Sequence, residues 1–92
     1  AAAKAGATML TKYFAQYLAG TGVTVNAVCP GPLASAKGRL SAEQIQRIES
    51  LVPVKRFGEP AEIAAAVALL VSDRGGFFLG ATLDMNGGLF MR

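Results

Sequence analysis

The sequence contains no histidine and no tryptophan, and its single cysteine is Cys29. Without histidine, imidazole-based metal sites and Ser-His-Asp catalysis are excluded within this chain. One cysteine cannot form an internal disulfide, and such sparse cysteine usage suits a reducing compartment. Because Cys29 lies at the end of a predicted strand and has no histidine partner, we interpret it as a buried structural residue.

Charged residues are also few, at 16% of the chain against 52% hydrophobic residues. The formal net charge of +3 is scattered from Lys4 to Arg92, so no basic stripe indicates nucleic-acid binding. The longest uncharged apolar run, Ile63 to Val71, is much shorter than the roughly 20 residues of a membrane-spanning helix. No signal-peptide pattern is present. We therefore expect a soluble, cytoplasmic protein that binds neither nucleic acid nor membranes.

Hydrophobic periodicity and turn residues predict three helices and two strands. The expected elements are a helix from Ala1 to about Ala19, a strand over Val23–Val28, helices over Ala42–Leu51 and Pro60–Ser72, and a strand over Ala81–Met85. Pro30 should end the first strand because it has no amide to donate to a ladder. Ser41 and Gln44 predict a capping box, and Pro60 suits a first helical position.

The apolar faces of these helices give the expected packing residues. The first helix carries a wide face formed by Met9, Leu10, Tyr13, Phe14, Tyr17 and Leu18, on which both tyrosines are interpreted as packing residues. The two later helices are expected to turn inward Ile45, Ile48 and Leu51, and Ile63, Val67, Leu70 and Val71, respectively.

The order helix-strand-helix-helix-strand contains a crossover unit, which normally returns right-handed to a parallel sheet. A parallel sheet needs several strands and covered faces, and two strands alone leave open edges that favour association. The predicted fold class is therefore α/β, and the elements look like half of a doubly wound parallel-sheet domain. We see no domain boundary within residues 1–92.

Four motifs occur in order along the chain: "AAAKAG", "VTVNAVCPGPLAS", "PVKRFGEPAEIAAAVALLVSD" and "GATLDMNGG". Together they resemble the C-terminal part of the short-chain dehydrogenase/reductase family, most closely its 3-oxoacyl-[acyl-carrier-protein] reductase-like members. The resemblance covers essentially the whole chain. It implies that residues 1–92 are the C-terminal part of a single Rossmann-type domain whose N-terminal dinucleotide-binding half is absent.

The family's catalytic signature is Y-x-x-x-K, and Ala1-Ala2-Ala3-Lys4 supplies its last four positions. The tyrosine would immediately precede Ala1. Residues four apart share a helix face, so the Lys4 ammonium would lie near the phenol and favour its ionised form. The resemblance implies that Lys4 is catalytic and also binds the ribose hydroxyls of the nicotinamide cofactor. The alternative is an ordinary solvated helix lysine.

The segment "CPGPLAS" leaves the carboxyl end of the first strand, where doubly wound sheets bind their ligands. By resemblance, Pro30 and Gly31 line the nicotinamide pocket, Gly31 because a side chain there would obstruct the ring. Leu33 matches the position whose backbone meets the carboxamide. Ser35 stands where the family usually has a threonine that hydrogen-bonds the cofactor. The alternative is a plain strand-to-helix loop, and no metal site is predicted.

The resemblance implies an NAD(P)(H)-dependent oxidoreductase that transfers hydride between nicotinamide and a carbonyl or alcohol. A 3-oxoacyl thioester is the first expected substrate, and a small alcohol or sugar the second. A homodimer or homotetramer is expected, with the first helix and the "DMNGGLFM" tail as subunit contacts. The alternative is that the chain as it stands is an inactive, protein-associating remnant whose partner is its own missing N-terminal half.

Overall fold

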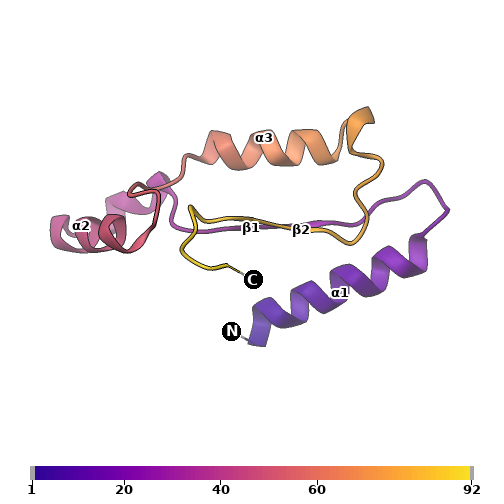
Figure 1. Cartoon of the computed structure of the whole chain (residues 1–92), viewed down its shortest axis with the longest axis horizontal. Coiled ribbons are helices and arrows are strands. Elements are labelled where there is room, and N and C mark those ends of the chain that lie inside the picture. The colour runs from indigo at the N-terminus through magenta and orange to yellow at the C-terminus, as the bar shows by residue number, and fades with distance from the viewer. Residues whose placement is uncertain (1, 92) are drawn as a thin grey trace. The chain divides into compact units, whose positions relative to one another are not determined.

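The computed structural model describes residues 2–91, so the predicted helix start at Ala1 lies outside the described residues. In chain order the elements are α1 (Ala2–Leu18), β1 (Ala27–Pro30), the 3-10 helix η1 (Ala34–Arg39), α2 (Ala42–Leu51), α3 (Pro60–Leu70), the 3-10 helix η2 (Asp73–Gly75) and β2 (Thr82–Met85) (Figure 1). The predicted α/β class and helix-strand-helix-helix-strand order are confirmed. The two 3-10 helices lie in segments that the sequence predicted as loop or turn.

The two strands form a parallel pair. The Ala27 amide donates to the Ala81 carbonyl at 2.8 Å and the Gly31 amide to the Met85 carbonyl at 3.0 Å, with the same sequence offset. The prediction of a strand over Val23–Val28 was wrong at both ends, because hydrogen-bonding partners rather than β-branched residues set the ladder. Successive amides point to alternate sides of a strand, so the missing donor of Pro30 does not face β2.

The chain forms two compact units, which are described separately. The first contains the residues up to Val28 together with Ala66–Leu83, and the second contains Cys29–Ala65 together with the residues from Asp84 onward. In the first unit, Thr11 and Ala15 of α1 are buried. The Asn26 amide nitrogen donates to the Phe78 carbonyl at 3.2 Å, and its oxygen accepts from the Ala81 amide at 3.0 Å.

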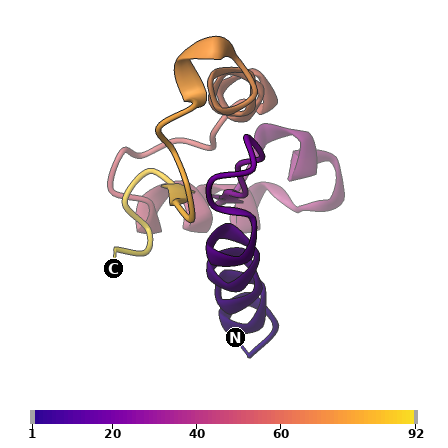
Figure 2. The same cartoon turned by 90° about the vertical axis from the view of Figure 1, so that its right-hand side faces the viewer.

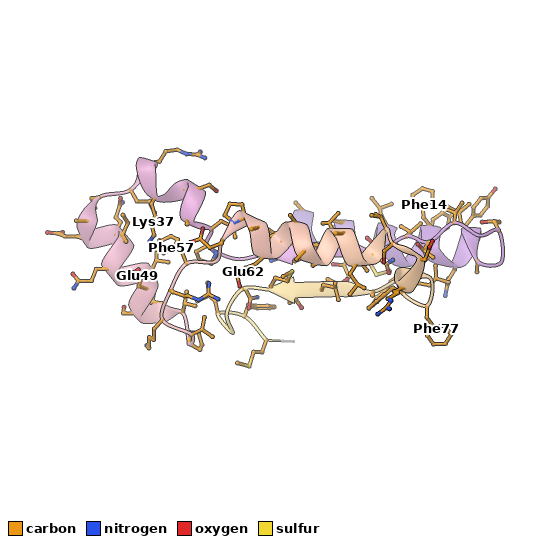
Figure 3. All side chains as sticks on the ribbon, turned by 90° about the horizontal axis from the view of Figure 1, so that it is seen from above. Phe14, Lys37, Glu49, Phe57, Glu62 and Phe77 are labelled. Carbon is orange, nitrogen blue, oxygen red and sulfur yellow. The ribbon has the colours of Figure 1, made fainter. Side chains whose placement is uncertain are left out.

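The apolar face predicted for α1 is largely uncovered. Tyr13 and Tyr17 are 60% and 72% exposed, so their interpretation as packing residues was wrong for this chain. The Tyr13 ring stacks with that of Tyr17, with centroids 6.4 Å apart, and meets the Phe14 ring edge-on, with centroids 5.2 Å apart. Phe77, on the loop before β2, also projects outward (Figure 3). The first unit therefore presents aromatic surface.

The second unit is organised by the loop between α2 and α3 rather than by the helix faces. Val52 and Phe57 are only 1% and 3% exposed, whereas Leu51, which was predicted to point inward, is exposed. Burial of a valine or phenylalanine stabilises a fold by about 1.5–3 kcal/mol, so these two side chains are the main anchors of the unit. Cys29 is half-buried, less than predicted.

Local signals set the helix starts. The Ser41 hydroxyl accepts from the Gln44 amide at 3.1 Å and the Gln44 side chain accepts from the Ser41 amide at 2.9 Å, which confirms the predicted capping box. Helix α3 begins at Pro60 as predicted but ends at Leu70 rather than Ser72. Val67 and Val71, predicted to lie on the inward face of this helix, are exposed.

Backbone hydrogen bonds join the two ends of the segment from η1 to Phe57, which also contains α2. The Ala34 amide donates to the Gly58 carbonyl at 2.8 Å, and the Gly58 amide donates to the Pro32 carbonyl at 2.9 Å. Within this segment the Lys37 ammonium lies 4.9 Å from the centre of the Phe57 ring, and Figure 3 shows the two side chains near Glu49. The loop that leaves β1 is thus held by the same segment that carries the buried Phe57.

Candidate functional site

Lys4 lies in α1 with its side chain exposed. Its carbonyl accepts a hydrogen bond from the Thr8 hydroxyl at 3.1 Å, and within residues 2–91 its ammonium forms no ion pair. The predicted tyrosine position lies outside the described residues. Lys4 belongs to the first unit and the cofactor-loop candidates to the second.

The loop candidates follow one another along the end of β1 and into η1. Pro30 is exposed, Gly31 and Leu33 are half-buried, and Ser35 is exposed in η1. The Leu33 carbonyl accepts from the Ala36 amide at 2.9 Å. Among residues 2–91, neither the Leu33 amide nor the Ser35 hydroxyl has a hydrogen-bond partner. An open backbone donor and an open hydroxyl fit the contacts to a carboxamide and a cofactor that were predicted for this loop.

Gly31 is required here for a reason that the sequence did not reveal. Its φ is not positive, so backbone freedom is not what selects glycine. A Cβ placed on Gly31 would lie 2.6 Å from the Cβ and 2.8 Å from the Cα of Asn86. The absence of a side chain therefore allows the residue that follows β1 to lie directly against the residue that follows β2.

A pocket of about 210 Å³ adjoins this loop in the second unit. It is lined by Pro32, Val54, Arg56, Gly58, Glu62, Ile63, Met85, Asn86 and Gly87. Its charged groups form a bidentate pair, in which Arg56 Nη1 lies 2.7 Å from Glu62 Oε1 and Nη2 lies 3.0 Å from Oε2. Arg56 also donates to the Phe57 carbonyl at 3.0 Å. The pocket therefore offers apolar walls beside a neutralised ion pair.

Sequence reasoning missed this ion pair. The Glu59 amide donates to the Glu62 carboxylate at 2.9 Å, which is the backbone half of a capping box at the start of α3. The spacing of Glu59, Pro60 and Glu62 was a usable signal for that contact. Nothing local indicated Arg56, which reaches Glu62 from the loop before the helix.

The Arg56–Glu62 pair predicts a specific pH dependence of stability. The hydrogen bond from Arg56, then that from the Glu59 amide, lowers the pKa of Glu62 from 4.5 to about 2, and the pKa of Arg56 is raised. A lowered carboxyl pKa gives stability that is present above pH 4.5 and lost as the pH falls toward 2. Because both side chains are about half exposed, the effect should be small.

Glu62→Gln should remove the loss of stability that protonation of Glu62 causes at acid pH. Urea unfolding of the variant and of the unaltered protein between pH 2 and 5 would measure this difference in the free energy of unfolding. Glu43→Gln, on the exposed surface of α2, is the matched control and should leave the dependence unchanged. Parallel acid profiles of the Glu62→Gln variant and the parent would contradict the prediction.

Comparison with known proteins identifies the family. The family model described as Enoyl-(Acyl carrier protein) reductase matches residues 1–90. A solved structure from Brucella melitensis, titled short-chain dehydrogenase/reductase and glucose/ribitol dehydrogenase, matches 99% of this chain and 37% of that chain, with a TM-score of 0.85 and 31% identity. The chain belongs to the short-chain dehydrogenase/reductase family. A second short-chain dehydrogenase, from Bacillus anthracis, gives a TM-score of 0.82 at 35% identity over 99% of this chain and 36% of that chain.

Curated relatives in this family agree with the predicted subgroup. The acetoacetyl-CoA reductase of Shinella zoogloeoides is 47% identical over 97% of this chain, and the 3-oxoacyl-[acyl-carrier-protein] reductase of Staphylococcus epidermidis is 44% identical over 98%. The chain spans 38% and 37% of the length of these relatives. The resemblance stated from the sequence is therefore confirmed, whereas the roles of Lys4 and the loop residues stay predictions.

No helix within residues 2–91 is long and apolar enough to cross a membrane. In the same part of the chain, no group of three or more histidine, cysteine, aspartate or glutamate side chains is placed to hold a metal ion.

Proposed function

We propose that this chain supplies the C-terminal part of the active site of an NAD(P)(H)-dependent oxidoreductase that transfers hydride between nicotinamide and a carbonyl or alcohol substrate. The family match over residues 1–90 carries this proposal. The open Leu33 amide and Ser35 hydroxyl support it, since they lie where the resemblance implies cofactor contacts.

Each predicted site residue has a distinct task in this proposal. The Lys4 ammonium holds the ribose hydroxyls and stabilises the ionised form of the tyrosine that would precede Ala1, bringing its proton transfer toward neutral pH. Pro30 and Gly31 form one wall for the nicotinamide, the Leu33 backbone meets its carboxamide and Ser35 donates a hydroxyl contact. The bound nicotinamide supplies or accepts the hydride.

The names of the curated relatives favour a 3-oxoacyl thioester as substrate. Acetoacetyl-CoA reductase and 3-oxoacyl-[acyl-carrier-protein] reductase both name such a thioester. A small alcohol or sugar is the second candidate, supported by the glucose/ribitol dehydrogenase title of the Brucella melitensis structure. We also propose self-association through the exposed apolar face of α1, in keeping with its uncovered tyrosines.

The test is a nicotinamide absorbance assay on a protein that joins this chain to a family dinucleotide-binding part ending in the signature tyrosine. Acetoacetyl-CoA should be reduced with a kcat/KM about 100-fold above that of a simple ketone, because the thioester supplies extra binding energy. The 92-residue chain alone should show no turnover. Absence of hydride transfer by the joined protein with every carbonyl and alcohol tested would contradict the proposal, and turnover by the pure chain would contradict the expected inactivity of the part.

A further inference from the structure

The residues after β2 form a tight turn held by one side chain. The Asn86 oxygen Oδ1 accepts from the Gly88 amide at 3.0 Å, and its nitrogen Nδ2 donates to the Phe90 carbonyl at 2.9 Å. The Asn86 carbonyl accepts from the Leu89 amide at 3.1 Å. Three hydrogen bonds of one residue thus close the segment 86–90, which we name the C-terminal turn.

The C-terminal turn rests on the buried part of the second unit. Gly87 and Gly88 have φ of +63° and +88°, and a Cβ on Gly87 would lie 2.7 Å from a Val52 methyl carbon. The Gly87 carbonyl accepts from the Val54 amide at 3.2 Å. Figure 2 shows the chain after β2 curling back beside the segment that follows α2. Since Val52 is only 1% exposed, the turn is seated on a fixed support.

Asn86 also lies directly against the candidate cofactor loop. A Cβ on Gly31 would lie only 2.8 Å from the Cα of Asn86. The Gly31 amide also donates to the carbonyl of Met85, the residue before Asn86. Atoms packed this closely cannot shift independently, because overlap is repulsive and a gap loses dispersion contacts. Displacement of Asn86 would therefore displace Gly31 and the loop that follows it.

We propose that Asn86 is a positioning residue for the nicotinamide-binding loop: its side-chain amide fixes the C-terminal turn, which in turn fixes Gly31. This inference rests on the proposed function for its cofactor, but the coupling of Asn86 to Gly31 stands on the contacts alone. The C-terminal turn then affects the affinity for the cofactor and not the hydride-transfer step itself.

The test uses Asn86→Ala and Asn86→Asp in the joined protein, with Met91→Ala as the control. Aspartate keeps the acceptor for Gly88 but cannot donate to the Phe90 carbonyl, so it removes one hydrogen bond in a side chain of nearly equal shape. Met91 is 77% exposed, and its side chain forms no hydrogen bond among residues 2–91 although its methyl carbon lies near Gly88, so the control removes a side chain next to the turn while keeping all three hydrogen bonds of Asn86.

Amide hydrogen exchange and steady-state kinetics are measured on the same samples. We expect both Asn86 variants to speed exchange of the Gly31 amide and to raise the KM for the nicotinamide cofactor, each roughly tenfold, at nearly constant kcat, with no change in Met91→Ala.

Unchanged Gly31 exchange in both Asn86 variants would overturn the positioning role, and so would faster exchange with an unchanged cofactor KM. If the unaltered protein transfers no hydride, the proposed function fails by itself. Faster Gly31 exchange would in that case still support the coupling between Asn86 and the loop. Asn86→Asp keeps the test valid if Asn86→Ala does not fold.

Discussion

Lys4→Met in the joined protein is expected to lower kcat for hydride transfer by about 10³-fold, within the range that a positioned acid–base group contributes. The substitution keeps the length and the helix propensity of the side chain, so α1 should be unaffected. It removes the ammonium, and with it the charge that we propose to stabilise the ionised tyrosine. An unassisted phenol titrates near pH 10, so the remaining activity should rise with pH above neutrality.

Lys12→Met is the matched control, because Lys12 is a second exposed lysine on the same helix. It should change kcat less than about threefold, as expected for a surface substitution away from the site. Lys4→Arg keeps the charge but replaces a compact ammonium by a planar fork, so it should recover only part of the lost activity. A kcat for Lys4→Met equal to that of Lys12→Met would show that Lys4 is an ordinary surface lysine.

Elements whose boundaries depend on neighbouring residues were predicted well from the sequence. The capping box of Ser41 and Gln44 and the start of α3 at Pro60 are decided within four residues, by side-chain oxygens and by the fixed φ of proline. The strand boundaries were predicted less well. A run of β-branched residues favours extended backbone, but the partner strand decided that β1 would begin at Ala27.

The packing of the second unit was not predictable from periodicity. Phe57 lies in an irregular loop and Val52 is the C-cap of α2, one residue beyond the predicted helix, yet these two are the most buried large side chains among residues 2–91. Leu51 precedes Val52 by one residue and is exposed. Val52, whose amide still bonds to the Ile48 carbonyl, continues the half-buried face of Ile45 and Ile48, whereas Leu51 lies off that face.

In the candidate site, too, some features were predicted from the sequence and others were not. The residue types at Lys4, Pro30, Gly31, Leu33 and Ser35 were recognisable by resemblance, because short motifs retain their order and spacing. The Arg56–Glu62 pair and the hydrogen bonds of Asn86 to Gly88 and Phe90 were not predicted, although they join residues only two to six apart, because the residue types alone do not fix the loop conformations that bring these groups together. The side-chain amide of Asn86 closes a turn with Gly88 and Phe90 directly after β2.

Gly31→Ala is expected to destabilise the protein by about 2 kcal/mol even when no cofactor is bound, the usual cost of overpacking a close contact. The added methyl would lie 2.6 and 2.8 Å from the Cβ and Cα of Asn86, closer than the 3.0 Å limit that real Cβ atoms respect. Relief requires β1 and the C-terminal turn to separate, which weakens the bond from the Gly31 amide to the Met85 carbonyl. Urea unfolding without cofactor measures the loss.

Gly38→Ala is the matched control, since a Cβ on Gly38 meets nothing within 4 Å and its φ is not positive. It should be neutral or slightly stabilising, because alanine restricts the unfolded chain. The pair of variants separates two reasons for glycine at position 31. If the nicotinamide ring alone excludes a side chain, Gly31→Ala will unfold like Gly38→Ala and lose only cofactor affinity. If the contact with Asn86 excludes it, stability falls first, and weaker cofactor binding follows from the displaced loop.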